Sequence, residues 1–411
     1  MSLTFSLNKS LMKRVLCVGN YFYPKGGSDR YFINLVQLLN EKGYSAIPFT
    51  TSHKLNETSK WSSYFLPPNS TDHYSLTSSI NLFHSRAAQK SIRNLLSRET
   101  VNIAHLNIYS QFSSSILAPL KESGIPIVQT LHDYKPVCPT YSFYRQEKIC
   151  EACGTGSNWQ VITKKCNRGS YLRSFATLAE SYFAQYKGSI KSINHFISVC
   201  EFQRQKLLQY NILPEESITT IPNFIDTKYF SPTGKKGQYL LYFGRVEEYK
   251  GLHTLINAVA PLKHINLVIA GEGSVKEELQ EKVTHQNLNH ITFLPFQQNQ
   301  ALLDLISGAL CTVIPSKVYE LCPMSILESF ALEKMVIGTN EGGIPELITD
   351  QQNGLLFKSD DEFDLRAKIV SAFDKKQNTI AMGVEGRKTV EEKYNIHRHY
   401  EALQKVYNYL S

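Results

Sequence analysis

The chain has 411 residues, of which 42% are hydrophobic and 19% charged. This composition is typical of a folded globular protein and excludes an intrinsically disordered one, and the length suggests two domains. No apolar run approaches the roughly 18 residues that span a bilayer, and residues 1–13 show no secretory pattern, so we expect a cytoplasmic protein. The net charge of +8 favours anionic partners such as nucleotides, phospholipid surfaces or nucleic acid.

Short apolar runs alternate with helical patterns along the whole chain. In the first half these runs lie at 14–19, 45–50, 101–106, 125–130 and 195–199. In the second half they lie at 239–243, 265–270, 291–294, 309–314, 335–339 and 354–357. Such alternation predicts α/β folding, with parallel sheets covered by helices on both faces.

The pattern occurs twice, with a break near residues 221–237. We predict two doubly wound, Rossmann-like domains that face each other across a cleft. The first spans residues 1–224 and the second 225–393, and residues 394–411 form a helix that packs back on the first domain.

Two glutamates, Glu320 and Glu328, follow the apolar run 309–314. The first lies in a loop, and the second lies one turn into a helix predicted to start near Ser325. Ligands of open α/β sheets bind at the carboxyl ends of strands, where two carboxylates suit sugar hydroxyls. The alternatives are a capping box between Ser325 and Glu328 and a solvated loop carboxylate at Glu320.

Arg245 and Lys250 follow the apolar run 239–243. Arginine offers a planar fork to phosphate oxygens, and lysine offers a compact positive charge. Together with the N-terminus of a helix predicted to start near Lys250, they suit a diphosphate that gains negative charge as it leaves. The alternative is an ordinary surface ion pair with Glu247 or Glu248.

Small residues and one histidine follow other predicted strands. Gly271 and Gly273 flank Glu272 after the run 265–270, and a diglycine, Gly26-Gly27, precedes the predicted N-cap Ser28. Small residues let a backbone approach a nucleotide or phosphate closely. His132 ends another strand and is a candidate for the cleft, the alternative being a hydrogen bond to a neighbouring loop.

Taken in order, these motifs closely resemble the family 4 retaining glycosyltransferases (glycosyl transferases group 1), which have the two-domain GT-B fold. The resemblance covers nearly the whole chain and is more specific in its second half. It rests on Gly26-Gly27, His132, Gly244-Arg245 with Lys250-Gly251, Gly271-Glu272-Gly273, Glu320-x7-Glu328 and Gly342-Gly343-Ile344-Pro345-Glu346 with Asn353-Gly354. Two positions depart from the family pattern, which has Glu at Asp29 and Ala at Ser329.

The resemblance implies a role for each of these residues. Arg245 and Lys250 would bind the donor diphosphate, while Glu328 would bind the ribose and Glu320 the donor sugar. Backbone amides would complete the phosphate site, Gly27 would approach the phosphate and His132 would contact the sugar. The implied catalytic residues are Glu320, His132, Arg245 and Lys250. The implied donor-binding residues are Gly26, Gly27, Arg245, Lys250, Gly271, Gly273, Glu320, Met324, Ser325, Ile326 and Glu328.

The resemblance also implies a reaction. A sugar would pass with retention from a UDP- or GDP-sugar to a glycan or lipid-linked acceptor, in the setting of bacterial surface polysaccharide synthesis. No cofactor would be required, and the sequence contains no Asp-x-Asp pair that would chelate a metal-bound diphosphate. The leaving phosphate would help to deprotonate the acceptor, so no protein general base is assigned.

Four cysteines mark an insert at about residues 134–170. Cys150 and Cys153 form a Cys-x-x-Cys pair, flanked by Cys138 and Cys166. This spacing suits a structural zinc ion, and free or redox-active thiols are the alternative, since disulfides are disfavoured in the cytoplasm. The nearby aromatics Tyr134, Tyr141, Phe143 and Tyr144 suit either stacking on acceptor sugars or a small core.

Residues 86–98 form a basic amphipathic pattern. We consider peripheral contact of this helix with anionic lipid at the inner face of the membrane, against an ordinary solvated face. Two rival functions remain. One is a nucleotide-sugar epimerase of the same fold, and the other is a zinc-stapled nucleic-acid-binding protein. We favour the transferase, with no nucleic-acid partner, because the nucleic-acid alternative leaves the paired glutamates and the Arg/Lys pair without a role.

Overall fold

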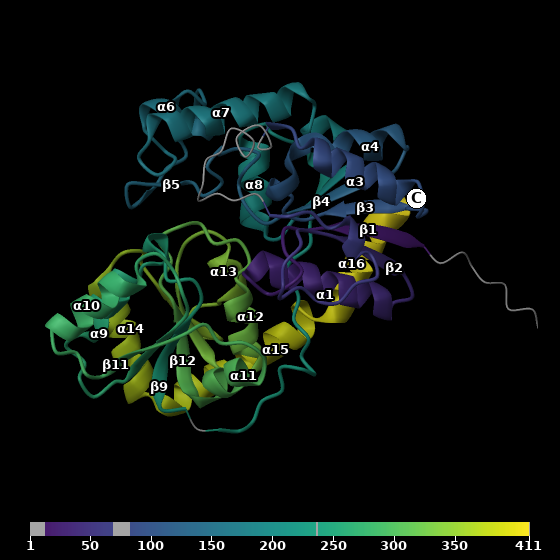
Figure 1. Cartoon of the computed structure of the whole chain (residues 1–411). Coiled ribbons are helices and arrows are strands. Elements are labelled where there is room, and N and C mark those ends of the chain that lie inside the picture. Colours follow the sequence, from purple (N-terminus) through teal and green to yellow (C-terminus); the bar gives the residue numbers. More distant parts are fainter. Residues whose placement is uncertain (1–12, 69–82, 236, 411) are drawn as a thin grey trace, which may run out of the picture. The chain divides into compact units, whose positions relative to one another are not determined.

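The computed structural model describes residues 13–68, 83–235 and 237–410 (Figure 1). The chain forms two compact units. Unit 1 comprises Met1–His132, Ala179–Ile197 and Gln404–Ser411, and unit 2 comprises Asp133–Leu178 and Ser198–Leu403. These units do not coincide with the predicted domains, because residues 133–178, which include the cysteine-bearing insert, and residues 198–224 fall in unit 2. The predicted domains follow the two sheets, and their boundaries stay a prediction.

The first sheet has six strands in the order β2-β1-β3-β4-β7-β8. The pairs β1/β2, β1/β3 and β3/β4 are parallel, as the strand–helix alternation predicted. Its strands are β1 (Arg14–Val18), β2 (Ser45–Phe49), β3 (Ile103–Leu106), β4 (Ile127–Leu131), β7 (His195–Ser198) and β8 (Ile218–Thr220). The helices of this part are α1 (Gly27–Glu41), α3 (Arg86–Leu96), α4 (Leu117–Glu122), α7 (Tyr171–Tyr186) and α8 (Glu201–Gln209), with 3-10 turns η1 (Ser62–Tyr64), η2 (Ser110–Ile116), η3 (Ile190–Ser192) and η4 (Glu215–Ser217).

The second sheet has the order β11-β10-β9-β12-β13-β14, and all its strand pairs are parallel. This is the strand order of the Rossmann fold. Its strands are β9 (Tyr239–Phe243), β10 (Leu267–Ala270), β11 (Ile291–Leu294), β12 (Ala309–Ile314), β13 (Met335–Thr339) and β14 (Gly354–Phe357). The helices are α9 (Leu252–Val259), α10 (Lys276–His285), α11 (Asn299–Gly308), α12 (Met324–Ala331), α13 (Ile344–Leu347), α14 (Glu362–Asp374), α15 (Lys376–Lys393) and α16 (Ile396–Leu410), with the 3-10 turn η5 (Glu248–Lys250).

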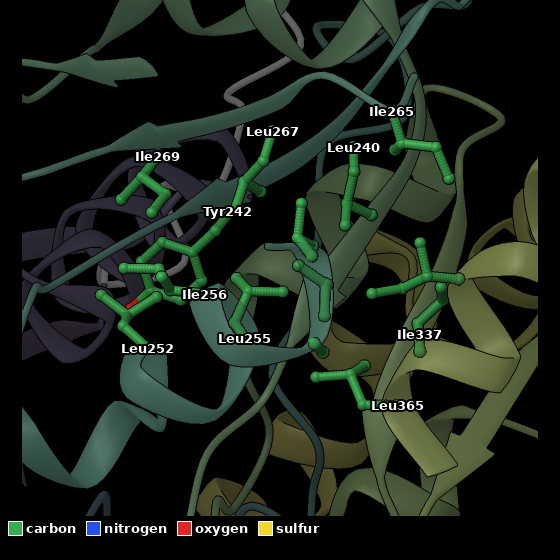
Figure 2. Packing of buried hydrophobic residues seen from close by; sticks show 14 of the residues in the cluster. Leu240, Tyr242, Leu252, Leu255, Ile256, Ile265, Leu267, Ile269, Ile337 and Leu365 are labelled. Atoms are coloured by element: carbon green, nitrogen blue, oxygen red, sulfur yellow. The ribbon is translucent and has the colours of Figure 1, made fainter. Parts of the chain in front are cut away.

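The core of the second sheet lies between its strands and the flanking helices α9 and α14. Figure 2 shows Leu240 of β9 and Ile337 of β13 beside Leu255 of α9 and Leu365 of α14, and each of these side chains is fully buried. Burying one such side chain contributes about 1.5–3 kcal/mol. This packing holds the strands in register, and thereby the loops at their carboxyl ends.

Helix α3 covers most of the basic pattern predicted at 86–98. Ser85 caps it, and its oxygen accepts a hydrogen bond of 3.2 Å from the Ala88 amide. Its apolar side chains Ala88, Ile92 and Leu95 are fully buried. The apolar face of this helix therefore belongs to the core of unit 1 and is not available to a membrane.

The last helix, α16, ends in unit 1, where Tyr407 is 1% exposed. The Tyr407 hydroxyl lies 2.6 Å from Nδ1 of His105, whose Nε2 lies 2.7 Å from Oγ1 of Thr130. Within the described ranges, no helix has the length and apolar content needed to cross a bilayer.

Candidate functional site

The second sheet has its topological switch point between β9 and β12. These strands are neighbours, and the chain continues from β9 to β10 on one side and from β12 to β13 on the other. Loops that diverge from such a point leave room for a ligand at the carboxyl ends of the strands. Arg245 and Lys250 lie in the loop after β9, and Glu320 lies in the loop after β12.

Glu320 and Lys250 form an ion pair at this edge. Lys250 Nζ lies 2.5 Å from Glu320 Oε1, and the two side chains are 18% and 15% exposed, respectively. Ser316 Oγ donates a second hydrogen bond of 2.6 Å to the same oxygen. Burial alone would raise the pKa of Glu320, but the charge and hydrogen bond of Lys250, with Ser316 and Arg245, bring the net pKa below its usual value. Glu320 is therefore a held, ionised carboxylate and not a solvated loop residue.

Arg245 is exposed beside this pair. Its guanidinium carbon lies 5.5 Å from the ring centroid of Tyr249. In the part of the chain that the structure describes, Glu247 instead accepts from Ser274, and Glu248 lies 3.5 Å from His253. The alternative of a surface ion pair between Arg245 and these glutamates is thus not observed, and its guanidinium is available to an anion.

Helix α12 presents its N-terminus at the same edge. Its N-cap is Pro323 and no side chain caps the helix, so Ser325 lies inside the helix and is not the N-cap of a capping box. Glu328 is 3% exposed. Three amides were predicted to bind phosphate. That of Ile326 donates a hydrogen bond of 3.1 Å to the backbone oxygen of Pro323, whereas Met324 and Ser325 are the first two residues of the helix. A helix N-terminus with such amides attracts anions.

Ser329, one of the two residues that depart from the family pattern, has a structural partner. It accepts a hydrogen bond of 2.9 Å from Thr312 of β12 and donates one of 2.7 Å to the Ser325 oxygen. This contact ties the first turn of α12 to the strand that precedes it.

The glycines of the second sheet pack loop against loop. A Cβ on Gly271 would lie 1.8 Å from the Gly244 oxygen, and one on Gly273 would lie 2.1 Å from the Val246 oxygen. These residues therefore hold the loop that carries Arg245, and their predicted contact with the donor stays a prediction. The Gly343 amide donates a hydrogen bond of 2.6 Å to the backbone carbonyl oxygen of Glu320.

The predicted residues Gly26, Gly27 and His132 lie in unit 1. Gly26 is the N-cap of α1, and the helix begins at Gly27, so the prediction of Ser28 as N-cap is wrong. His132 follows β4, with Nε2 3.3 Å from Asn107 Oδ1 and its ring 4.7 Å from that of Tyr31. These contacts orient the imidazole within unit 1.

The four cysteines of the insert gather around a short hairpin in unit 2. The hairpin pairs β5 (Tyr144–Arg145) with β6 (Lys148–Ile149), and the short helices α5 (Ala152–Thr155) and α6 (Gln160–Thr163) follow. All four thiols are free. Burial, and then the neighbouring Cys138, Cys166 and Cys150, raise the pKa of Cys153 to about 12. Among the residues that the structure describes, no three His, Cys, Asp or Glu side chains are arranged to hold a metal ion. Zinc binding by this cluster stays a prediction.

The aromatics of the insert form a small core rather than an open stacking platform. Tyr134 and Phe143 are 2% and 1% exposed, and both rings lie within 6.5 Å of the Tyr319 ring. Tyr141 differs, with 60% exposure.

One carboxylate that the sequence did not reveal links the insert to the loop of Glu320. Glu151 lies between Cys150 and Cys153 in the sequence, and its oxygens accept from Lys206 at 2.8 Å and from Tyr319 at 2.7 Å. Tyr210 also donates to it. Tyr319 is the chain neighbour of Glu320, so Glu151 helps to fix the backbone that presents that carboxylate. No local pattern signals this contact, because it joins residues 168 positions apart.

Replacing Glu151 with Gln should lower the free energy of unfolding by about 2 kcal/mol at neutral pH, since the charged acceptor of hydrogen bonds from three side chains is lost. Burial would raise the pKa of Glu151, but hydrogen bonds from Lys206, Tyr210 and Tyr319 lower it overall. Its stabilising contribution is therefore present at neutral pH and should disappear below about pH 4. Urea unfolding against pH measures both effects. Glu147→Gln, an exposed carboxylate of the same hairpin, is the control, and equal behaviour of the two variants would contradict the prediction.

Known proteins share sequence and fold with this chain. Residues 25–229 match Glycosyltransferase Family 4, and residues 226–389 match Glycosyl transferases group 1. The chain belongs to the group 1 glycosyltransferases and has their GT-B fold. An uncharacterized glycosyltransferase of Methanocaldococcus jannaschii is 28% identical over 171 residues, which cover 42% of this chain and 48% of that protein.

Solved structures show the same fold over nearly the whole chain. Sucrose-phosphate synthase from Thermosynechococcus elongatus has a TM-score of 0.73 and 17% identity, covering 97% of this chain and 99% of its own. Anabaena HepE in complex with UDP-glucose has a TM-score of 0.66 and 14% identity, covering 96% and 98%. The chain spans about half the length of the curated relative from M. jannaschii.

Proposed function

We propose that this protein transfers a sugar, with retention of configuration, from a UDP- or GDP-sugar to a hydroxyl of a glycan or lipid-linked acceptor. The observation that carries the proposal is the arrangement at the β9/β12 switch point. There a held carboxylate, Glu320, lies 2.5 Å from Lys250 and beside the exposed Arg245. The group 1 family, and the UDP-glucose complex of the structurally similar Anabaena HepE, support it.

The chemistry follows from these groups. As the bond between sugar and phosphate breaks, negative charge builds on the departing nucleoside diphosphate. Arg245, Lys250 and the N-terminus of α12 would stabilise that charge, and more strongly in the transition state than in the ground state. Glu320, ionised at neutral pH, accepts hydrogen bonds from sugar hydroxyls and fixes the sugar for attack.

We assign the acceptor's proton to the leaving phosphate and not to a protein base. His132 would position the donor sugar. The sequence has no Asp-x-Asp pair, and the protein's own cations would neutralise the diphosphate, so the transfer is proposed to need no metal. Bacterial surface polysaccharide synthesis at the cytoplasmic side of a membrane is the setting we propose.

UDP or GDP should stabilise the wild-type protein by about 2.7 kcal/mol at a hundredfold excess over its Kd, with or without EDTA. Arg245→Ala should weaken that binding about 10- to 100-fold, because a charge-assisted hydrogen bond is lost. Thermal shift against UDP, GDP, ADP and their sugar conjugates measures both. Arg98→Ala, an exposed arginine in unit 1, is the matched control.

Three outcomes would count against the proposal. If no diphosphate stabilises the wild type, or if Arg245→Ala responds as the wild type does, the switch point is not the donor site. Donor consumption that proceeds to an epimer without any acceptor would replace transfer by epimerisation. A salt-sensitive shift of DNA or RNA in place of any nucleotide response would favour nucleic-acid binding.

A further inference from the structure

The insert in unit 2 carries a concentrated positive charge. Residues 134–170 contain six Lys or Arg and two Glu. One of the two acids, Glu151, is already paired with Lys206 at 2.8 Å. The insert therefore presents a net positive surface that the donor chemistry does not use.

Much of this charge lines one pocket of about 480 Å³ between the β5–β6 hairpin and residues 163–169. Four cationic side chains line it, and none of its lining residues is acidic. Arg145 Nε donates a hydrogen bond of 2.7 Å to the backbone oxygen of Lys164, and this bond joins the hairpin to the end of α6. Among the described residues, no acidic side chain lies within 4 Å of the charged group of Lys164, Lys165 or Arg168. Such a pocket suits a phosphate group.

Large apolar side chains are exposed next to this pocket. They are Trp159 (59% exposed), Tyr171 (58%), Leu172 (78%) and Phe175 (55%). Lys165 Nζ lies 4.4 Å from the centroid of the Tyr171 ring, so the pocket and the apolar group are continuous. The backbone amide of Asn167 donates a hydrogen bond of 3.0 Å to Ser174 Oγ, which fixes residues 163–169 against the start of α7. Figure 1 shows α6 beside α7.

A cationic pocket beside exposed aromatic and aliphatic side chains is typical of proteins that rest on an anionic membrane surface. Aromatic rings sit at the headgroup level, aliphatic side chains reach the acyl boundary, and Lys and Arg attract lipid phosphates. A second copy of this chain fits less well, because two basic pockets would then face each other. The surface therefore matches an anionic bilayer in both charge and apolar character.

We propose that this surface docks the protein on an anionic phospholipid membrane. Trp159, Tyr171, Leu172 and Phe175 insert at the interface, and the pocket of Arg145, Lys164, Lys165 and Arg168 binds lipid phosphate. The docking site replaces the helix at 86–98, whose apolar side chains are buried. The proposal does not depend on sugar transfer.

The test is sedimentation of the full chain with vesicles. One set contains phosphatidylglycerol mixed with phosphatidylcholine, and the other contains phosphatidylcholine alone. The wild type should bind the anionic vesicles, bind less at high salt and bind pure phosphatidylcholine weakly. Lys165→Gln with Arg168→Gln should weaken binding about 25-fold, since each cation near the surface contributes about fivefold. Leu172→Ser with Phe175→Ser should weaken it about tenfold or more.

Matched variants lie elsewhere in unit 2. Phe363→Ser removes a phenylalanine that is 70% exposed, and Lys393→Gln with Arg398→Gln removes two exposed cations. Both should bind as the wild type does. A cooperative thermal unfolding transition at the wild-type temperature would show that each docking variant is folded, whether or not the donor site binds a nucleotide.

Several results would overturn the proposal. These are a wild type that does not bind anionic vesicles, docking variants that bind as well as the controls, and control variants that lose binding equally. A shift from oligomer to monomer in Leu172→Ser with Phe175→Ser, without vesicles, would assign the surface to contact between copies instead.

Discussion

Replacing Glu320 with Gln should lower the kcat of sugar transfer by about 100-fold or more. The substitution keeps the size of the side chain but removes its charge. It leaves Lys250, which is 18% exposed, without its carboxylate partner. We also expect a loss of about 2–3 kcal/mol in the free energy of unfolding, since breaking a buried ion pair costs more than breaking an exposed one. Steady-state kinetics and urea unfolding measure the two effects.

The direction in which pH changes the stability contributed by Glu320 follows from the pKa of its carboxyl group. Although burial opposes it, Lys250 holds the pKa of Glu320 below its usual value. A carboxylate with a lowered folded-state pKa stabilises the protein above its unfolded-state pKa of about 4.3, and that contribution is lost as the pH falls through the folded-state value. The stability difference between wild type and Glu320→Gln should therefore be largest at neutral pH and shrink under acid conditions.

A surface carboxylate supplies the comparison. Glu122 pairs with Arg93 at 2.9 Å, but the two side chains are 60% and 50% exposed. Glu122→Gln should change the free energy of unfolding by less than about 0.5 kcal/mol and leave kcat unchanged. If Glu320→Gln kept the wild-type kcat, Glu320 would have no part in positioning the sugar.

The sheets were predictable because a strand of a parallel sheet is buried on both faces. Such strands appear in the sequence as short apolar runs, and the runs at 239–243 and 309–314 match β9 and β12 residue for residue. Position at the carboxyl end of a strand then predicted that Lys250 and Glu320 would lie near each other. In the structure Lys250 Nζ lies 2.5 Å from Glu320 Oε1, while the roles of the two residues toward the donor stay a prediction.

Helix starts were less predictable, since the preferred capping residues are not used. Ser28 and Ser325 have the right chemistry for an N-cap, but the caps are Gly26 and Pro323. At α12, the Pro323 oxygen accepts the Ile326 amide at 3.1 Å, so the helix begins one residue before Ser325.

The contact of Glu151 with Tyr319 could not be predicted at all. The spacing of the cysteines predicts that their thiols lie close together. It does not predict the orientation of the hairpin between them. Only the folded insert brings Glu151 to within 2.7 Å of the Tyr319 hydroxyl. The same holds for the exposed group at the start of α7, because helical spacing does not show which face of a helix is left uncovered.

Replacing Gly251 with Ala should lower the free energy of unfolding by about 2–5 kcal/mol and reduce kcat strongly. Gly251 has φ of +71°, where an L-residue is strained by about 1–2 kcal/mol. Its added Cβ would also lie 1.9 Å from the Pro315 oxygen, so backbone must move, at a further cost of about 1–3 kcal/mol. The segments that would separate carry Lys250 on one side and Ser316 and Glu320 on the other.

Gly124→Ala isolates the strain from the clash. Gly124 has φ of +68°, and its added Cβ would meet nothing within 4 Å. It should therefore lose only about 1–2 kcal/mol, with kcat unchanged. Urea unfolding and steady-state kinetics of both variants separate the two costs. If Gly251→Ala matched Gly124→Ala in both measurements, the loops after β9 and β12 could separate without disturbing the Lys250–Glu320 pair. Catalysis would then not depend on the close packing of these two loops.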